Sequence, residues 1–179
     1  MPITETQLRE KISAAIRDVP DFPKKGILFK DIMPLLADHK SFQALIDFLA
    51  ERYSNRGIKK VLGIEARGFI LAAPLALKIG AGMVPVRKKG KLPYKTISAT
   101  YDLEYGQDTL QVHEDAISRG EKVLIIDDVL ATGGTASAVC SLVKQLGGEV
   151  EEIAMLIELL FLKGREKLKE YEVFSVIKY

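Results

Sequence analysis

Short apolar segments of strand length alternate with segments of helical spacing along most of this chain. The strand-like segments are residues 61–64, 83–86, 123–126 and 153–157, and the helical ones are residues 41–53, 68–78 and 135–146. Uninterrupted apolar strands are typical of a parallel sheet that is buried on both faces, and their alternation with helices indicates an α/β architecture. We therefore predict a central, mainly parallel sheet with helices on both faces.

The N-terminal residues 1–35 precede this alternation and form what we expect to be a small hood region. Residues 4–7 (TETQ) have the pattern of a capping box. Apolar residues then follow at helical spacing as far as Ile16, and the two prolines after it are expected to end the helix. Residues 21–34 (DFPKKGILFKDIMP) place turn residues around a short apolar run, so we predict a structured loop there.

Residues 87–115 interrupt the alternation. They lack a helical period, but strand-like residues at 97–105 and 109–113 flank a turn at Gly106 and follow the polar segment 87–95 (RKKGKLPYK). A connection this long within a compact domain is usually functional or disordered. We therefore expect a two-stranded flexible lid.

Length and composition are those of an ordinary globular domain. The chain has 179 residues, of which 47% are hydrophobic and 28% charged, and we predict a single domain over residues 1–179. The 26 Lys and Arg residues and 24 Asp and Glu residues leave a net charge of +2. This balance gives no overall reason to expect a nucleic-acid partner.

Other residue counts exclude further classes of protein. Cys140 is the single cysteine, so an intrachain disulfide and a Cys-based zinc site are both impossible, and the two histidines lie far apart in the sequence. The N-terminal segment carries charges where a secretory signal needs its apolar core. The longest apolar stretch, 69–77, is much shorter than the roughly 20 residues of a membrane span. We expect a cytoplasmic protein that does not enter a membrane.

The most informative segment is the run 123–135 (VLIIDDVLATGGT), in which a strand leads through two carboxylates into a loop and then a helix. Ligands of open α/β sheets bind beyond the carboxyl ends of the strands, and backbone N–H groups at a glycine-rich helix start bind anions. We therefore predict a phosphate-binding loop. Its residues are Ala131, Thr132, Gly133, Gly134 and Thr135.

Asp127 and Asp128 would repel a bare phosphate and so need another role. Carboxylates beside a phosphate site suit a sugar diol or a hydrated Mg²⁺, and the whole run therefore indicates a sugar phosphate. The alternative is that TGGT only caps a helix and that both aspartates are solvated at a strand end. The signatures of P-loop nucleotide binding, dinucleotide binding, serine hydrolysis and zinc proteolysis do not occur in this sequence.

The same run resembles the motif with which type I phosphoribosyltransferases bind 5-phosphoribosyl-1-pyrophosphate (PRPP). The segments DFPKKGILFKDI, EARGF and RKKGKLP with YDLEYG are similar to those of the adenine-specific branch of that family, in the same order and spacing from about residue 21 to residue 167. Ala66 stands where serine would be equally expected. The resemblance implies a type I phosphoribosyltransferase fold, the reaction of adenine with PRPP to give AMP and pyrophosphate, Mg²⁺ carried on PRPP, and a homodimer.

The resemblance also implies which residues meet the pyrophosphate. Positive charge must face a diphosphate leaving group, and the expected cations are Arg67, Arg87, Lys88 and Lys91. Arg67 stands where a strand passes into a helix, which makes a second anion site at a helix N-terminus. The alternative for the basic segment 87–91 is a solvated, lysine-rich loop.

The remaining roles implied by the resemblance concern the base. Glu104, in the LEYG stretch, is the expected acid/base group for the ring proton of adenine, and no protein side chain is expected to bind the metal directly. The adenine pocket would be formed by Ile27, Leu28 and Phe29, by main-chain groups of Lys30, and by Leu159 on the other face. The alternatives are that Leu28 and Phe29 are core residues and that Glu104 is an ordinary exposed residue of a hairpin.

Two other functions remain open at this point. A phosphoribosyltransferase for hypoxanthine, guanine or xanthine would have the same phosphate loop. A regulator could use the fold to sense PRPP and bind nucleic acid through a basic surface, although the N-terminal segment has room for only one helix before the DFP loop.

Overall fold

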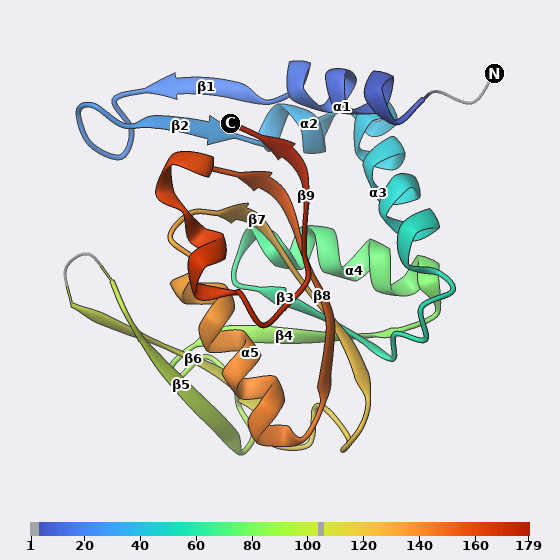
Figure 1. Ribbon diagram of the computed structural model, residues 1–179, viewed down its shortest axis with the longest axis vertical. Helices are drawn as coiled ribbons and strands as arrows, with labels where there is room; N and C mark the ends of the chain where they lie inside the picture. Colours follow the sequence, from blue (N-terminus) through green and yellow to red (C-terminus); the bar gives the residue numbers. More distant parts are fainter. Residues whose placement is uncertain (1–3, 104–105) are drawn as a thin grey trace. The chain divides into compact units, whose positions relative to one another are not determined.

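The structure is a computed structural model that describes residues 4–103 and 106–179 (Figure 1). The chain forms two compact units, Met1–Glu51 and Arg52–Tyr179. The boundary lies near the end of helix α3 (His39–Tyr53). The N-terminal unit contains the predicted hood region, and the larger unit contains the predicted sheet and phosphate loop.

The first unit begins with helix α1 (Glu5–Ala14), whose predicted capping box is confirmed. The Thr4 hydroxyl accepts a hydrogen bond from the backbone N–H of Gln7 at 3.3 Å, and the Thr4 backbone N–H donates to Oε1 of Gln7 at 2.9 Å. These two bonds satisfy groups that the start of a helix would otherwise leave unpaired. The capping box therefore fixes where the chain begins its first helix.

Two predictions in this unit are wrong. The first helix ends at Ala14, before Ile16, and residues 28–31 form a strand where we expected only loop. Strand β1 (Arg17–Pro20) pairs antiparallel with β2 (Leu28–Asp31) to form a separate two-stranded sheet, followed by the short helix α2 (Met33–Ala37). Each strand has four residues, which is too short for alternation of polar and apolar residues to reveal it.

A seven-stranded sheet forms the centre of the second unit and confirms the predicted architecture. Its strands are β3 (Lys60–Ile64), β4 (Gly82–Lys88), β5 (Thr96–Asp102), β6 (Gln107–His113), β7 (Lys122–Leu130), β8 (Glu149–Glu158) and β9 (Val173–Lys178). Their order across the sheet is β5-β6-β4-β3-β7-β8-β9, and the pairs from β4 to β9 are parallel. Strand β9 was not predicted from the sequence.

Helices α4 (Arg67–Ile79) and α5 (Gly134–Leu146) cover opposite faces of this sheet (Figure 1). Gly63 of β3 faces α4, where a Cβ atom would lie 2.6 Å from that of Ala72. Its neighbour Leu62 points to the other face and joins the buried cluster that includes Val139 of α5. Successive side chains of a strand point to opposite faces, so β3 is buried from both sides.

Residues 87–115 contain two paired strands, as predicted for the lid, and these strands extend the sheet. Strands β5 and β6 pair antiparallel over their whole lengths, and β6 also pairs with the end of β4 through Arg87 and Gln111. The flexibility of the lid remains a prediction. Among the described residues, no helix is both long enough and apolar enough to cross a membrane.

Candidate active site

The predicted phosphate loop connects β7 to α5 and encloses a small hollow. All five predicted residues, 131–135, line a cavity of 70 Å³ together with Asp127 and residues of β7, α5 and β8. A water molecule occupies about 30 Å³ in the liquid, so the hollow has room for one small anion. Within the described part of the chain, no side chain caps the start of α5. The first N–H groups of the helix are therefore available to an anion.

The glycine at position 133 is required by two features of this loop. Gly133 has φ +80°, a left-handed conformation that costs other residues energy. A Cβ atom at Gly133 would lie 2.3 Å from the carbonyl oxygen of Gly164, and one at Gly164 would lie 2.4 Å from that of Ala131. Both distances are far below a normal contact, so two backbone segments touch directly beneath the loop.

Asp127 and Asp128, at the end of β7, have different partners. The backbone N–H of Asp128 donates to Oδ1 of Asp127 at 2.8 Å, and the guanidinium of Arg67 forms an ion pair with the buried Asp128 carboxylate. Gly68 lets the start of α4 approach β7, because a Cβ there would lie 2.9 Å from the carbonyl oxygen of Ile126. The structure thus unites the predicted pyrophosphate residue Arg67 with the predicted ribose residues.

Burial and the neighbouring charge of Asp128 raise the pKa of Asp127 well above its ordinary value. A carboxyl whose pKa is raised by folding destabilises the folded state once the pH exceeds the ordinary value near 3.9, and the penalty grows until the folded pKa is passed. Each pKa unit of such a shift lowers the free energy of unfolding by about 1.4 kcal/mol once the group is fully ionised. We therefore expect Asp127→Asn to raise the Tm by a few degrees at pH 7.5 and by little at pH 4, as measured by differential scanning calorimetry.

A gain in Tm that is equal at both pH values would contradict this explanation. The same variant is expected to lose affinity for PRPP, because the asparagine side chain has one acceptor oxygen where the aspartate side chain has two. This one substitution would then raise the stability of the protein and lower its affinity for PRPP.

The other predicted pyrophosphate residues lie at the end of β4 or just after it, since the strand ends at Lys88. The guanidinium of Arg87 donates to both carboxylate oxygens of Glu65 at 3.3 and 3.1 Å, and the backbone N–H of Lys88 donates to the same carboxylate at 3.0 Å. The hydrogen bonds from Arg87 lower the pKa of Glu65 below its ordinary value. Lys88 Nζ is 3.1 Å from Asp108 on β6, and the carbonyl of Lys91 accepts a hydrogen bond from Arg87 at 3.2 Å. Arg87 is thus oriented by Glu65, whereas Lys88 pairs with the hairpin.

The predicted adenine residues are divided between the two units. Residues 27–30 lie in the first unit, where the ring of Phe29 packs edge-to-face against Phe22 at 5.1 Å and the ammonium of Lys30 is 2.6 Å from Asp18. Leu159 lies in the second unit, and its backbone N–H donates to the carbonyl of Leu130 at 3.0 Å. The adenine pocket therefore stays a prediction. The predicted acid/base residue Glu104 lies outside the described residues.

Sequence reasoning missed the turn formed by residues 163–167. This segment contains the short helix η2 (Gly164–Lys167), which follows η1 (Leu160–Leu162), and its Gly164 touches the phosphate loop. Lys167 lines a second, larger hollow of 480 Å³ beside Gly134. The glycine in LKGRE was the one available signal, but a lone glycine does not indicate which backbone it approaches.

Comparison with known proteins places this site in a family. The phosphoribosyl transferase domain matches residues 34–178. The adenine phosphoribosyltransferase of Geobacter metallireducens is 61% identical over 170 residues, which are 95% of this chain and 99% of that protein. This chain belongs to the adenine phosphoribosyltransferases.

Solved structures of adenine phosphoribosyltransferases have the same fold. The enzyme of Thermoanaerobacter pseudethanolicus is 52% identical with a TM-score of 0.92, covering 96% of this chain and 99% of that one. The enzyme of Saccharomyces cerevisiae, complexed with an imino-altritol bisphosphate and adenine, is 42% identical with a TM-score of 0.91 and the same coverage. The chain is thus a glycosyltransferase of purine salvage that transfers the 5-phosphoribosyl group of PRPP to adenine, giving AMP and pyrophosphate.

Proposed function

We propose that the 5′-phosphate of PRPP binds in the 70 Å³ hollow of the phosphate loop, with the ribose over Asp127 and Asp128. The observation that carries this assignment is that one small hollow is lined by the five loop residues and by Asp127. The hollow fits a single phosphate group, and the adjoining carboxylates accept hydrogen bonds from sugar hydroxyls. The diphosphate would then extend toward Arg67 at the start of α4.

Glycosyl transfer passes through a transition state in which the ribose carbon is positive and the diphosphate leaves with negative charge. Fixed charges that face these developing charges lower the barrier more than a covalent nucleophile would. Arg67 and Arg87 each form an ion pair with a carboxylate, that of Asp128 and that of Glu65 respectively. Because these arginines are already oriented, they would neutralise the leaving diphosphate with little rearrangement.

Magnesium is proposed to arrive on the diphosphate of PRPP. No cluster of three or more His, Cys, Asp or Glu side chains that could hold a metal occurs in the described residues 4–103 and 106–179. The residues fit a hydrated ion shared with the substrate, since Asp127 and Asp128 offer carboxylate oxygens that accept hydrogen bonds from its waters. When bound, Mg²⁺ would neutralise charge on the leaving pyrophosphate.

Glu104 is proposed to manage the ring proton of adenine. Glutamine at this position keeps the shape of the side chain but cannot exchange a proton, and general acid/base groups contribute about 10²–10⁴-fold to rates. We expect Glu104→Gln to lower kcat by about 100-fold or more while the KM for PRPP changes little, as measured by AMP formation. Near-normal turnover would exclude this role.

The whole assignment is tested by measuring nucleotide formation from PRPP with adenine, hypoxanthine, guanine and xanthine, with and without a chelator. Turnover with adenine alone, lost on chelation and restored by Mg²⁺, is the expected result. Turnover with a different base would refute the assignment of the N-terminal loop but not that of the phosphate loop. PRPP binding without turnover, together with salt-sensitive binding of nucleic acid, would support a sensor.

We also propose that the chain is a cytoplasmic homodimer. Support for a second copy comes from helix α4, which exposes Ile70 and Leu77 on one face, with 39% and 85% of their surfaces accessible. These residues lie seven positions apart, on one side of the helix, and apolar patches exposed in this way mark protein–protein contact sites. Support for the location comes from Cys140, a free and buried thiol that suits a reducing compartment. Sedimentation equilibrium at micromolar concentration tests the dimer.

A further inference from the structure

We infer that Arg165 is a positioning residue for PRPP: its ion pair with Glu158 holds the turn 163–167 against the phosphate loop. This inference rests on the proposed function of that loop. Gly164 is the point of contact, since its backbone lies against both Ala131 and Gly133. The residue that fixes Gly164 therefore fixes the floor of the anion hollow.

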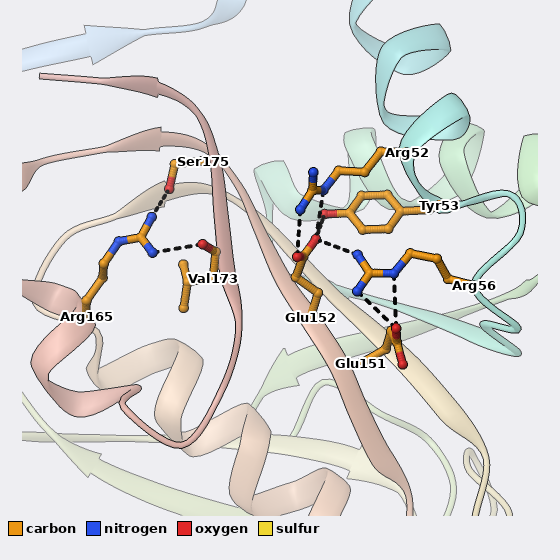
Figure 2. A network of polar contacts seen from close by, with 8 residues as sticks. All are labelled: Arg52, Tyr53, Arg56, Glu151, Glu152, Arg165, Val173 and Ser175. Atoms are coloured by element: carbon orange, nitrogen blue, oxygen red, sulfur yellow. Dashed lines mark hydrogen bonds and ion pairs between the residues drawn. The ribbon is translucent and has the colours of Figure 1, made fainter.

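Arg165 donates hydrogen bonds to three residues, Glu158, Val173 and Ser175. Its guanidinium donates to both carboxylate oxygens of Glu158 at 2.6 and 2.7 Å, and Nη1 donates to the carbonyl of Val173 at 2.8 Å. The Ser175 hydroxyl donates to the same carboxylate at 2.6 Å (Figure 2 shows Arg165 with Val173 and Ser175). A bidentate arginine pair fixes orientation as well as distance, so these contacts tie the turn to β8 and β9.

The position of Glu158 connects the Arg165–Glu158 ion pair, which we call the clamp, to the phosphate loop. Glu158 is the last residue of β8 and is buried, and it pairs in register with Leu130, the last residue of β7 before the loop. The hydrogen bonds from Arg165 lower the pKa of Glu158, which keeps the carboxylate charged. The clamp thus links the strand that ends at the loop with the turn beneath the loop.

A second ion-pair network on the same strand provides a matched control. Glu152 is buried near the other end of β8 and is bound by Arg52, Arg56 and the hydroxyl of Tyr53, while Arg56 also pairs with Glu151 (Figure 2). Neither these arginines nor their glutamates line the 70 Å³ hollow. A variant here perturbs an arginine–glutamate pair on β8 without touching the phosphate loop.

The test measures KM values for PRPP and adenine in Arg165→Ala, Arg165→Lys, Gly164→Ala and the control Arg56→Ala. We expect Arg165→Ala and Gly164→Ala to raise the KM for PRPP at least tenfold, with the KM for adenine within twofold of the unmodified chain. Arg165→Lys should recover part of the loss, because it keeps the charge but not the bidentate contact. Arg56→Ala should leave both KM values within twofold. Arg165→Lys gives an answer even if Arg165→Ala folds poorly, since it keeps the charge and loses only the bidentate contact, whereas Gly164→Ala tests the contact between the turn and the loop.

Three results would overturn the inference. An equal rise in the KM for PRPP in Arg56→Ala and in Arg165→Ala would show a general effect of stability. If the loop variant Thr135→Ala raises the KM for PRPP while the Arg165 and Gly164 variants do not, the clamp is wrong but the phosphate loop stands. If none of these variants changes the KM for PRPP, the proposed phosphate site itself is wrong, and the inference fails with it.

Discussion

Replacing Gly133 by alanine is expected to lower kcat/KM for PRPP by about 100-fold or more. The added Cβ would lie 2.3 Å from the carbonyl oxygen of Gly164, a backbone atom that cannot rotate away. Either the phosphate loop or the turn beneath it must therefore move, and a displacement of about 1 Å at a reacting substrate can cost 10²-fold. Steady-state kinetics with PRPP as the varied substrate measures the effect.

Gly57→Ala is the matched control for this variant. Gly57 also has a left-handed φ of +73°, but a Cβ there would meet no atom within 4 Å. Both variants incur the conformational cost of a positive φ, of order 1 kcal/mol, and only Gly133→Ala adds the collision. We expect Gly57→Ala to lower the Tm slightly and to leave kcat/KM unchanged. Equal kinetic effects in the two variants would contradict the steric explanation.

Replacing Arg67 by alanine is expected to lower kcat/KM for PRPP by about 30- to 1000-fold. This range corresponds to about 2–4 kcal/mol, the usual cost of removing one charge-assisted contact to the transition state. The loss should also appear in the reverse reaction as a raised KM for pyrophosphate. Arg67→Lys should recover part of the activity, because lysine keeps the charge but cannot bind a diphosphate through two parallel hydrogen bonds.

Arg67 also pairs with the buried Asp128, so its removal is expected to lower the Tm as well. Lys78→Ala is the control for this variant, because it removes a cation from the last turn of the same helix, at the opposite end from Arg67. We expect it to change kcat/KM less than twofold. A variant Arg67→Ala that loses stability but keeps its kcat/KM would show that Arg67 serves only as the partner of Asp128.

The sequence predicted the elements whose signals are local. The apolar strands at 61–64, 83–86, 123–126 and 153–157 all occur in the sheet, and the capping box at Thr4 is present. Strand β7 continues beyond the apolar run to Leu130, because Asp127 pairs with Met155 of β8 in spite of its charge and Val129 and Leu130 continue the pairing. Strands β1 and β2 were missed because each has only four residues, too few for an alternation of polar and apolar side chains to be recognised.

Most residues that carry the predicted chemistry of the site also lie close together in the sequence. The run 123–135 supplied the strand, the aspartates and the glycines in one continuous stretch, and this is sufficient to predict a phosphate loop and its family. It did not predict which arginine would pair with which carboxylate. Arg67 and Asp128 are separated by 61 residues, and only the parallel pairing of β3 with β7 brings their strand ends together.

The sequence by itself determined the fold class and, through its resemblance to a known family, the reaction, because the patterns that carry both lie within short segments. The tertiary structure alone decided that Gly164 supports the loop and that Arg165 holds Gly164 in place. Nothing in the segment LKGRE indicates a role in binding PRPP. Its contact with Gly133 arises because β7 and β8 end side by side, so that the turns after these two strands must pack against each other.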